Sequence, residues 1–208
     1  MNKLEIYYNS SPHTVSYADD WIYKQVAMSK TFFEQPLLTE LKNKVKSFEV
    51  VVDVGSNVGN HSYFFKNICD AGRVYAFEPV HSNYIICKEN IPNDDVYQIA
   101  LSNYVGFTTI ENSMGYNSGT GRMVSKEGEV EVSTLDSFKL EGVTFIKIDV
   151  EGEELFALEG MEQTIKSFSP EILIEVHYDI KIQDVMEKLP IKYTFEDLGD
   201  YHYFLKPY

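Results

Sequence analysis

The stretch EVVVDVGSNVGN, residues 49–60, decides the fold. Its first half is a run of apolar, β-branched residues, which is typical of a strand buried on both faces of a sheet. Gly55 permits a tight turn after this strand, and Gly59 permits close approach of helix, sheet and ligand. A helix is predicted to follow from Asn60 to Ala71. Ligands of open α/β sheets bind beyond the carboxyl ends of the strands, so a ligand site is predicted at this turn. A generic glycine turn is the alternative.

The same alternation of strand and helix continues along the chain. It predicts an α/β fold with a mostly parallel, seven-stranded sheet and helices on both faces. Two segments depart from it: residues 104–132 predict a hairpin with a Gly- and Ser-rich loop, and residues 192–208 predict a closing antiparallel hairpin around Leu-Gly-Asp. The further strands are expected in RVYAFEP (73–79), DVYQIALS (95–102), TFIKIDVEG (144–152) and PEILIEVHY (170–178), and the further helices over 81–90 and 153–168.

The first 47 residues do not show this regular alternation of strand and helix. A short strand is expected at 4–8 and helices at 19–28 and 35–46, the second of which has Pro36 in its first turn, where a missing N–H is harmless. We therefore expect a helical cap or lid over residues 1–47 and one Rossmann-like domain over residues 48–208.

Composition narrows the classes of function. The chain has 208 residues and a net charge of -14, which disfavours a nucleic-acid partner. Cys69 and Cys87 do not make a disulfide framework, and free thiols in a reducing, cytoplasmic compartment are expected. No apolar run reaches the roughly 18 residues of a membrane span, and the N-terminus lacks the apolar core of a signal peptide. The expected partner is a small-molecule or glycan acceptor, and the oligomeric state is left open.

Glu78 ends the second predicted strand, 23 residues after Gly55. A carboxylate at this place can accept both hydroxyls of a ribose, so turn and acid together predict a nucleoside cofactor; a solvated acid at the strand end is the alternative. The turn has the spacing Gly-x-x-x-Gly and lacks the third glycine of a pyrophosphate-binding turn. This favours S-adenosylmethionine, which has a ribose and an amino-acid tail but no pyrophosphate.

Several motifs taken together resemble the FkbM-type methyltransferase family. They are VVDVGSNVGNHS, YAFEPVHSNY, IALS, STLDSF, FIKIDVEGEELFALEG and ILIEVH, between about residues 50 and 177. The resemblance implies a class I methyltransferase fold, S-adenosylmethionine as methyl donor, and O-methylation of a carbohydrate or natural-product-like acceptor. It also implies site residues. Asp53, Gly55, Asn57 and Gly59, with Asn60 beside them, would contact the methionine part of the cofactor, Glu78 would hold the ribose, Ala100 and Leu101 would border the adenine, and Asp149 would face the transferring methyl group.

Methyl transfer to a hydroxyl requires a base within hydrogen-bond reach. The candidates are Asp149 and Glu151 after the fourth strand and His177 after the fifth, with Lys147 on the same side of its strand as the two acids. Each has another reading. Lys147 and Asp149 can form a bracing ion pair, Glu151 can complement a helix N-terminus, and His177 can be a hydrogen-bonded residue at a strand end.

Other hypotheses stay open at this stage. Asp149, Glu151 and His177 can form a metal-ligand set, although no His or Cys spacing requires one, and no metal is expected. His61 is expected to make a hydrogen bond at a helix start. The loop from Asn112 to Met123, with Tyr116 and Arg122, is a candidate lid. An NAD-dependent oxidoreductase would need a third turn glycine and a Tyr-x-x-x-Lys motif, and neither is found. A non-catalytic partner that binds S-adenosylmethionine is the third possibility.

Overall fold

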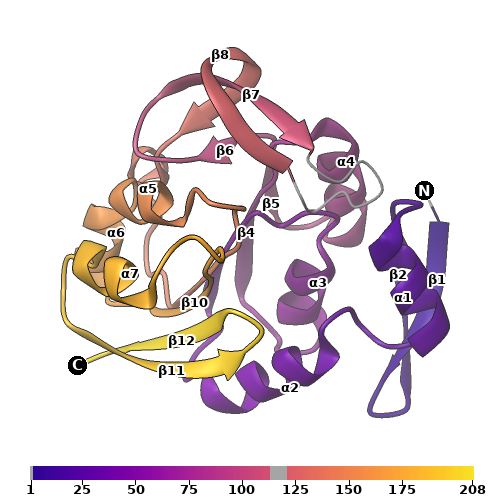
Figure 1. Ribbon diagram of the computed structural model, residues 1–208. Coiled ribbons are helices and arrows are strands. Elements are labelled where there is room, and N and C mark those ends of the chain that lie inside the picture. The colour runs from indigo at the N-terminus through magenta and orange to yellow at the C-terminus, as the bar shows by residue number, and fades with distance from the viewer. Residues whose placement is uncertain (1, 113–120) are drawn as a thin grey trace.

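A seven-stranded sheet forms the centre of the molecule. The computed structural model describes residues 2–112 and 121–208 (Figure 1). The strand order is β11-β12-β10-β9-β3-β4-β5; neighbours from β10 to β5 are parallel, and β12 and β11 are antiparallel. The predicted mostly parallel sheet and its closing hairpin are thus confirmed. The strands are β3 (Val50–Val54), β4 (Arg73–Phe77), β5 (Asp95–Tyr97), β9 (Phe145–Ile148), β10 (Glu171–Glu175), β11 (Tyr193–Gly199) and β12 (His202–Pro207).

Helices cover both faces of this sheet because its central strands are apolar on both sides (Figure 1). Val51 and Phe145 pack in the core with α3 and α4, whereas Val52 and Ile146 pack in the opposite core with α5, α6 and α7. The helices are α3 (Asn60–Asn67), α4 (His81–Asn90), α5 (Glu154–Glu159), α6 (Glu162–Phe168) and α7 (Ile182–Lys188), with a 3₁₀ turn at Leu135–Phe138.

Two predicted elements are divided in the structure. The helix expected over 153–168 is interrupted at Gly160, where a Cβ atom would lie 1.9 Å from the Ser102 carbonyl oxygen, so the two backbones approach too closely for a side chain. The strand expected over 95–102 leaves the main sheet after Tyr97. It continues as β6 (Ala100–Leu101), which pairs with β8 (Gly121–Ser133) in a small sheet that also holds β7 (Gly106–Asn112).

The N-terminal segment packs on the α3–α4 face. It consists of an antiparallel hairpin, β1 (Asn2–Tyr8) and β2 (Ser11–Tyr17), followed by α1 (Trp21–Ser29) and α2 (Gln35–Lys44). Two buried asparagines, Asn60 at the start of α3 and Asn90 at the end of α4, bind the N-terminal segment to the rest of the molecule. The Asn90 side chain bonds the backbone of Ser16 and the Val58 carbonyl, and Asn60 accepts from the Tyr17 hydroxyl at 2.7 Å.

Within residues 2–112 and 121–208, no helix has both the length and the apolar character needed to cross a membrane. The two cysteines are free thiols, as expected, and Cys87 packs directly under the glycine turn.

Candidate functional site

Two adjoining cavities open at the carboxyl edge of the sheet. The first has a volume of about 650 Å³ and lies between the β3 turn, the end of β4 and the small sheet. The second has a volume of about 700 Å³ and lies between the β3 turn and the N-terminal segment. Gly55, Asn57, Asp149 and Glu151 line both cavities, so they form the shared wall. Two ligands placed in these cavities would meet at this wall.

Glu78 lies in the wall of the first cavity at the end of β4. Its side chain is 4% exposed, and it accepts hydrogen bonds from the backbone N–H groups of Asn57 and Val80, each at 2.8 Å. Burial raises the pKa of Glu78 to about 7, against the opposing effect of these hydrogen bonds. The Asn83 side-chain amide donates a third, longer hydrogen bond to Glu78 Oε1 at 3.5 Å. A carboxylate has about four lone-pair sites, so one is open to a ligand hydroxyl, and a second becomes available where a ligand replaces the long Asn83 contact.

The turn after β3 is in direct contact with the loop after β9. Gly55 has a φ of +77°, and a Cβ atom there would lie 1.8 Å from the Asp149 carbonyl oxygen. Only glycine allows this backbone conformation and this approach together. The close contact brings the two loops together at the wall shared by the cavities.

The Lys147 side chain contacts both of these loops, the turn after β3 and the loop after β9. It is 4% exposed, and its Nζ lies 2.9 Å from the Gly55 carbonyl oxygen, 3.0 Å from Asp149 Oδ2 and 3.4 Å from Asp53 Oδ1. Burial alone would lower the pKa of Lys147, but the charges of Asp149 and Asp53 outweigh it and raise the pKa. The Lys147–Asp149 ion pair, one of the two sequence interpretations, therefore forms. All three ammonium donors face a partner.

Glu151 follows Asp149 on the shared wall, with a φ of +49°. A left-handed backbone at a non-glycine residue is strained, and such strain is concentrated at functional sites. Burial, and then the charge of Asp149, raises the pKa of Glu151 to about 7. A carboxyl group with a pKa near neutrality is well suited to accept a proton at physiological pH.

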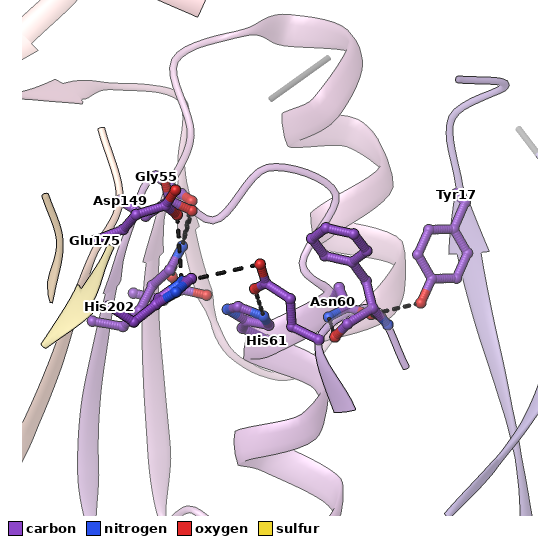
Figure 2. A network of polar contacts seen from close by, with 11 residues as sticks. Tyr17, Gly55, Asn60, His61, Asp149, Glu175 and His202 are labelled. Carbon is purple, nitrogen blue, oxygen red and sulfur yellow. Dashed lines mark hydrogen bonds and ion pairs between the residues drawn. The ribbon is translucent and has the colours of Figure 1, made fainter. Parts of the chain in front are cut away.

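A chain of polar side chains continues from the second cavity toward the C-terminal hairpin. Glu34 at the start of α2 lies 3.1 Å from His61 Nε2 and 4.0 Å from His202 Nε2, and His202 Nε2 lies 3.5 Å from Glu175 Oε2. Figure 2 shows His61 and His202 between Asn60 on one side and Glu175 with Asp149 on the other. Glu34, Glu175 and His202 are not predicted as site residues from the sequence, since only the folded chain brings α2, β10 and β12 together.

The predicted site residues divide into those that line a cavity and those that support one. Ala100, Leu101 and Asn57 line the first cavity with Glu78. Asp53 is fully buried, where it accepts from the Ser62 hydroxyl and pairs with Lys147. Two further predicted cofactor-binding residues are Gly59 and Asn60. Gly59 lies against Cys87, and Asn60 lines the second cavity and forms hydrogen bonds with the Phe33 backbone.

His177 lines neither of these cavities in the described part of the chain. Its Nε2 contacts Arg122, and its Nδ1 lies 3.6 Å from Asp179. Burial and the charge of Arg122 lower the pKa of His177. The structure thus brings Asp149, Glu151 and Lys147 to the cavity lining, whereas His177 lies outside it, in contact with Arg122.

Two further sequence hypotheses concern metals and the lid. Among the residues that the structure describes, no three His, Cys, Asp or Glu side chains are arranged to hold a metal ion. The proposed lid falls largely on residues 113–120, which include Tyr116 and lie outside the described residues.

The sheet order, the glycine turn and the acid at the end of β4 define a Rossmann-like class I methyltransferase fold. The chain belongs to the FkbM methyltransferase family: the methyltransferase FkbM domain matches residues 53–201. A curated relative, the hexuronic acid methyltransferase AglP of Haloferax volcanii, is 30% identical over 167 residues, which cover 75% of this chain and 67% of the relative. The family membership predicted from the sequence motifs is therefore confirmed.

Solved structures support the fold. A methyltransferase FkbM from Methylobacillus flagellatus KT matches with a TM-score of 0.55 and 18% identity, over 92% of this chain and 56% of that chain. A TehB-like SAM-dependent methyltransferase from Corynebacterium glutamicum matches with a TM-score of 0.51 and 9% identity, over 88% and 91% of the two chains. This chain thus spans little more than half the length of the first of these structures.

Proposed function

We propose that this protein transfers the methyl group of S-adenosylmethionine to a hydroxyl group of a carbohydrate or a similar small acceptor. The observation that carries the proposal is the buried Glu78 carboxylate in a cavity that opens on the glycine turn. The family membership supports methyl transfer, and the relative named for hexuronic acid methylation supports a carbohydrate acceptor.

The first cavity fits the cofactor in the chemistry of its lining, which combines apolar side chains with a few polar groups. Glu78 would accept the two ribose hydroxyls, and the apolar side chains of Ala100 and Leu101 would border the adenine ring. Gly55 and Asn57 would border the amino-acid tail, next to the wall that both cavities share.

The bound cofactor would supply an activated methyl group with its leaving group already in place. The protein then has to align the acceptor and remove the hydroxyl proton, and alignment alone supplies much of the rate of such reactions. Glu151 is the residue we assign to the proton, because it lines both cavities and the pKa of its carboxyl group is about 7. Lys147 keeps Asp149 beside it and fixes the shared wall.

Calorimetric titration of S-adenosylhomocysteine and NAD tests the cofactor. Micromolar binding of S-adenosylhomocysteine alone is expected, with the binding lost in Glu78→Gln and kept in Glu141→Gln, an exposed acid just before β9. Binding of NAD instead would move the protein to the oxidoreductase class. No binding of S-adenosylhomocysteine would contradict the proposal.

Glu151→Gln tests the proton acceptor separately from the cofactor. We expect kcat at pH 7 to fall about 100-fold, the usual contribution of a general base, while the Kd for S-adenosylhomocysteine changes little. An unchanged kcat would show that another group removes the proton. Cofactor binding without turnover on any hydroxylated acceptor would instead favour the non-catalytic partner.

A further inference from the structure

The second cavity is built partly by the N-terminal segment. Trp21 and Ile22 at the start of α1, and Phe33 and Glu34 just before α2, form its outer wall. Its inner wall is the one shared with the first cavity, where Asp149 and Glu151 lie. A molecule in the second cavity would therefore face the place where the methyl group is transferred.

The walls of this cavity combine an aromatic surface with hydrogen-bonding groups. The Trp21 and Phe33 rings meet edge to face with centroids 5.9 Å apart, and Trp21 is 41% exposed. Aromatic faces next to polar side chains suit a molecule with both C–H and O–H surfaces, such as a sugar ring. His61 is 7% exposed, and its Nε2 makes no hydrogen bond of normal geometry, although it lies 3.1 Å from Glu34. This buried nitrogen keeps capacity for a ligand hydroxyl.

The charges on the walls are predominantly negative. Four carboxyl groups line the cavity, from Glu34, Asp149, Glu151 and Glu175, against the side chains of Lys147 and His61. Burial raises the pKa of Glu175 to about 9, so the negative charge at neutral pH lies on the other three acids, with Glu151 partly ionised at its pKa of about 7. Burial alone would raise the pKa of Glu34, but the neighbouring His61, followed by the charges of His202 and Lys147, outweighs burial and lowers the pKa, so Glu34 is ionised at neutral pH.

Neither basic side chain in the described lining is available to a ligand anion. The three donors of Lys147 already face Gly55, Asp149 and Asp53. His61 Nε2 lies 3.1 Å from Glu34 Oε2, so a ligand carboxylate at this nitrogen would also lie beside the Glu34 carboxyl group. A ligand carboxylate in this cavity would meet carboxyl groups without a free cation, and such like-charge contacts oppose binding.

We propose that the second cavity is the acceptor site and that it takes a sugar without a carboxylate, with a preference for an amino sugar. The inference rests on the proposed function, and it departs from the relative whose name specifies a hexuronic acid. Glu34 is a specificity-determining residue in this proposal: its charge favours an ammonium group and opposes a carboxylate.

Three matched acceptors test the charge preference. For each of the gluco, galacto and manno configurations, the methyl glycosides of the hexose, the 2-amino-2-deoxyhexose and the hexuronic acid are supplied with S-adenosylmethionine, and released S-adenosylhomocysteine is measured. Binding to the protein loaded with S-adenosylhomocysteine is followed by saturation-transfer NMR. We expect the best neutral or amino sugar to exceed the matching uronate at least tenfold. Preference for the uronate, or binding of none of the nine sugars, would overturn the proposal.

Two variants connect the preference to the cavity. Glu34→Gln is expected to reduce the ratio of amino-sugar to uronate turnover about tenfold, whereas Glu141→Gln, which removes an equal charge at an exposed position away from both cavities, leaves the ratio unchanged. If Glu34→Gln fails to fold, the comparison of the matched acceptors in the parent protein decides the proposal alone. An equal ratio in parent and folded variant overturns the assignment. Titration of S-adenosylhomocysteine alone separates the two proposals, because only failure of the proposed function abolishes that binding.

Discussion

Replacing Gly55 by alanine forces a methyl group into the contact between the two loops that separate the cavities. Two costs add at this position. The first is the left-handed backbone at φ +77°, which costs an alanine about 1–2 kcal/mol. The second is the collision of the new Cβ with the Asp149 carbonyl oxygen at 1.8 Å, which requires a backbone shift of the kind that costs about 1–3 kcal/mol.

Gly142 provides the matched control, since only the first cost applies there. Its φ is +67°, and a Cβ atom would meet nothing nearer than Val50 Cγ2 at 4.0 Å. The effect of the substitution on the unfolded chain is the same in both variants and cancels in the comparison. Gly55→Ala is therefore expected to be less stable than Gly142→Ala by about 1–3 kcal/mol, which is the cost of the collision alone.

Urea denaturation followed by far-UV circular dichroism measures this difference. Calorimetry with S-adenosylhomocysteine is the second readout, and we expect it to show loss of binding in Gly55→Ala but not in Gly142→Ala. Equal free energies of unfolding in the two variants would refute the reasoning, because the β3 turn and the β9 loop would then not be in obligatory contact.

Three further predictions concern protons and the N-terminal segment. The affinity for S-adenosylhomocysteine should rise as the pH rises through about 7, because ligand hydroxyls that donate to Glu78 favour its ionised form, so that binding releases a proton. Calorimetric titration over this pH range would argue against hydroxyl binding by Glu78 if the affinity of the parent does not change with pH, or if the change persists in Glu78→Gln. Burial, and then the charge of Asp149, raises the pKa of Glu175 to about 9, so the folded state keeps a proton that the unfolded chain has lost above its ordinary pKa of 4.5. The parent should therefore lose stability relative to Glu175→Gln as the pH rises from about 5 to 9. Thermal unfolding of both proteins measures this, and a stability difference that is constant or that changes in the opposite direction with pH would contradict the raised pKa. Asn60→Ala should lower the free energy of unfolding by about 2–3 kcal/mol, since it leaves the Tyr17 hydroxyl and the Phe33 backbone without their buried partner; denaturation within 0.5 kcal/mol of the parent would not fit.

The central strands were predictable because their signal is local. Val50–Val54 and Glu171–Glu175 are apolar runs of the kind that only a doubly covered strand requires. The division of residues 95–102 between two sheets was not predictable, since the change of partner after Tyr97 depends on pairing with β8, more than 30 residues away. The strand Ser11–Tyr17 was missed for a similar reason, because Pro12 and His13 weaken its pattern and β1 supplies its register.

One helix that was not predicted does have a local signal in the sequence. The helix α7 carries Ile182, Val185 and Met186 at spacings of three and four, and these side chains pack in the core on the α5–α6 side. The break at Gly160 had only a weak signal, since a single glycine is tolerated in many helices and its reason lies in the approach of Ser102.

The residues of the candidate site that come directly after a strand could be predicted from the sequence. Glu78, Asp149 and Glu151 come directly after β4 and β9, and the parallel sheet places all such ends at one edge. Glu34 carries no such signal. It reaches the site because α2 begins there, and its neighbours His61 and His202 come from positions 27 and 168 residues further along the chain.

The net negative charge of the whole chain and the negative charge of the second cavity both oppose an anionic acceptor. The dependence of the acceptor preference on salt concentration distinguishes these two contributions. The net charge of -14 repels anions over long distances, an effect that falls away beyond about 8–10 Å at physiological ionic strength and further at higher salt. Contacts with Glu34 and Asp149 inside the cavity are shielded less, because these two side chains are only 27% and 31% exposed. A preference for amino sugars over uronates that persists at about 0.5 M salt would therefore arise at the cavity wall, and one that disappears would arise from the net charge of the protein.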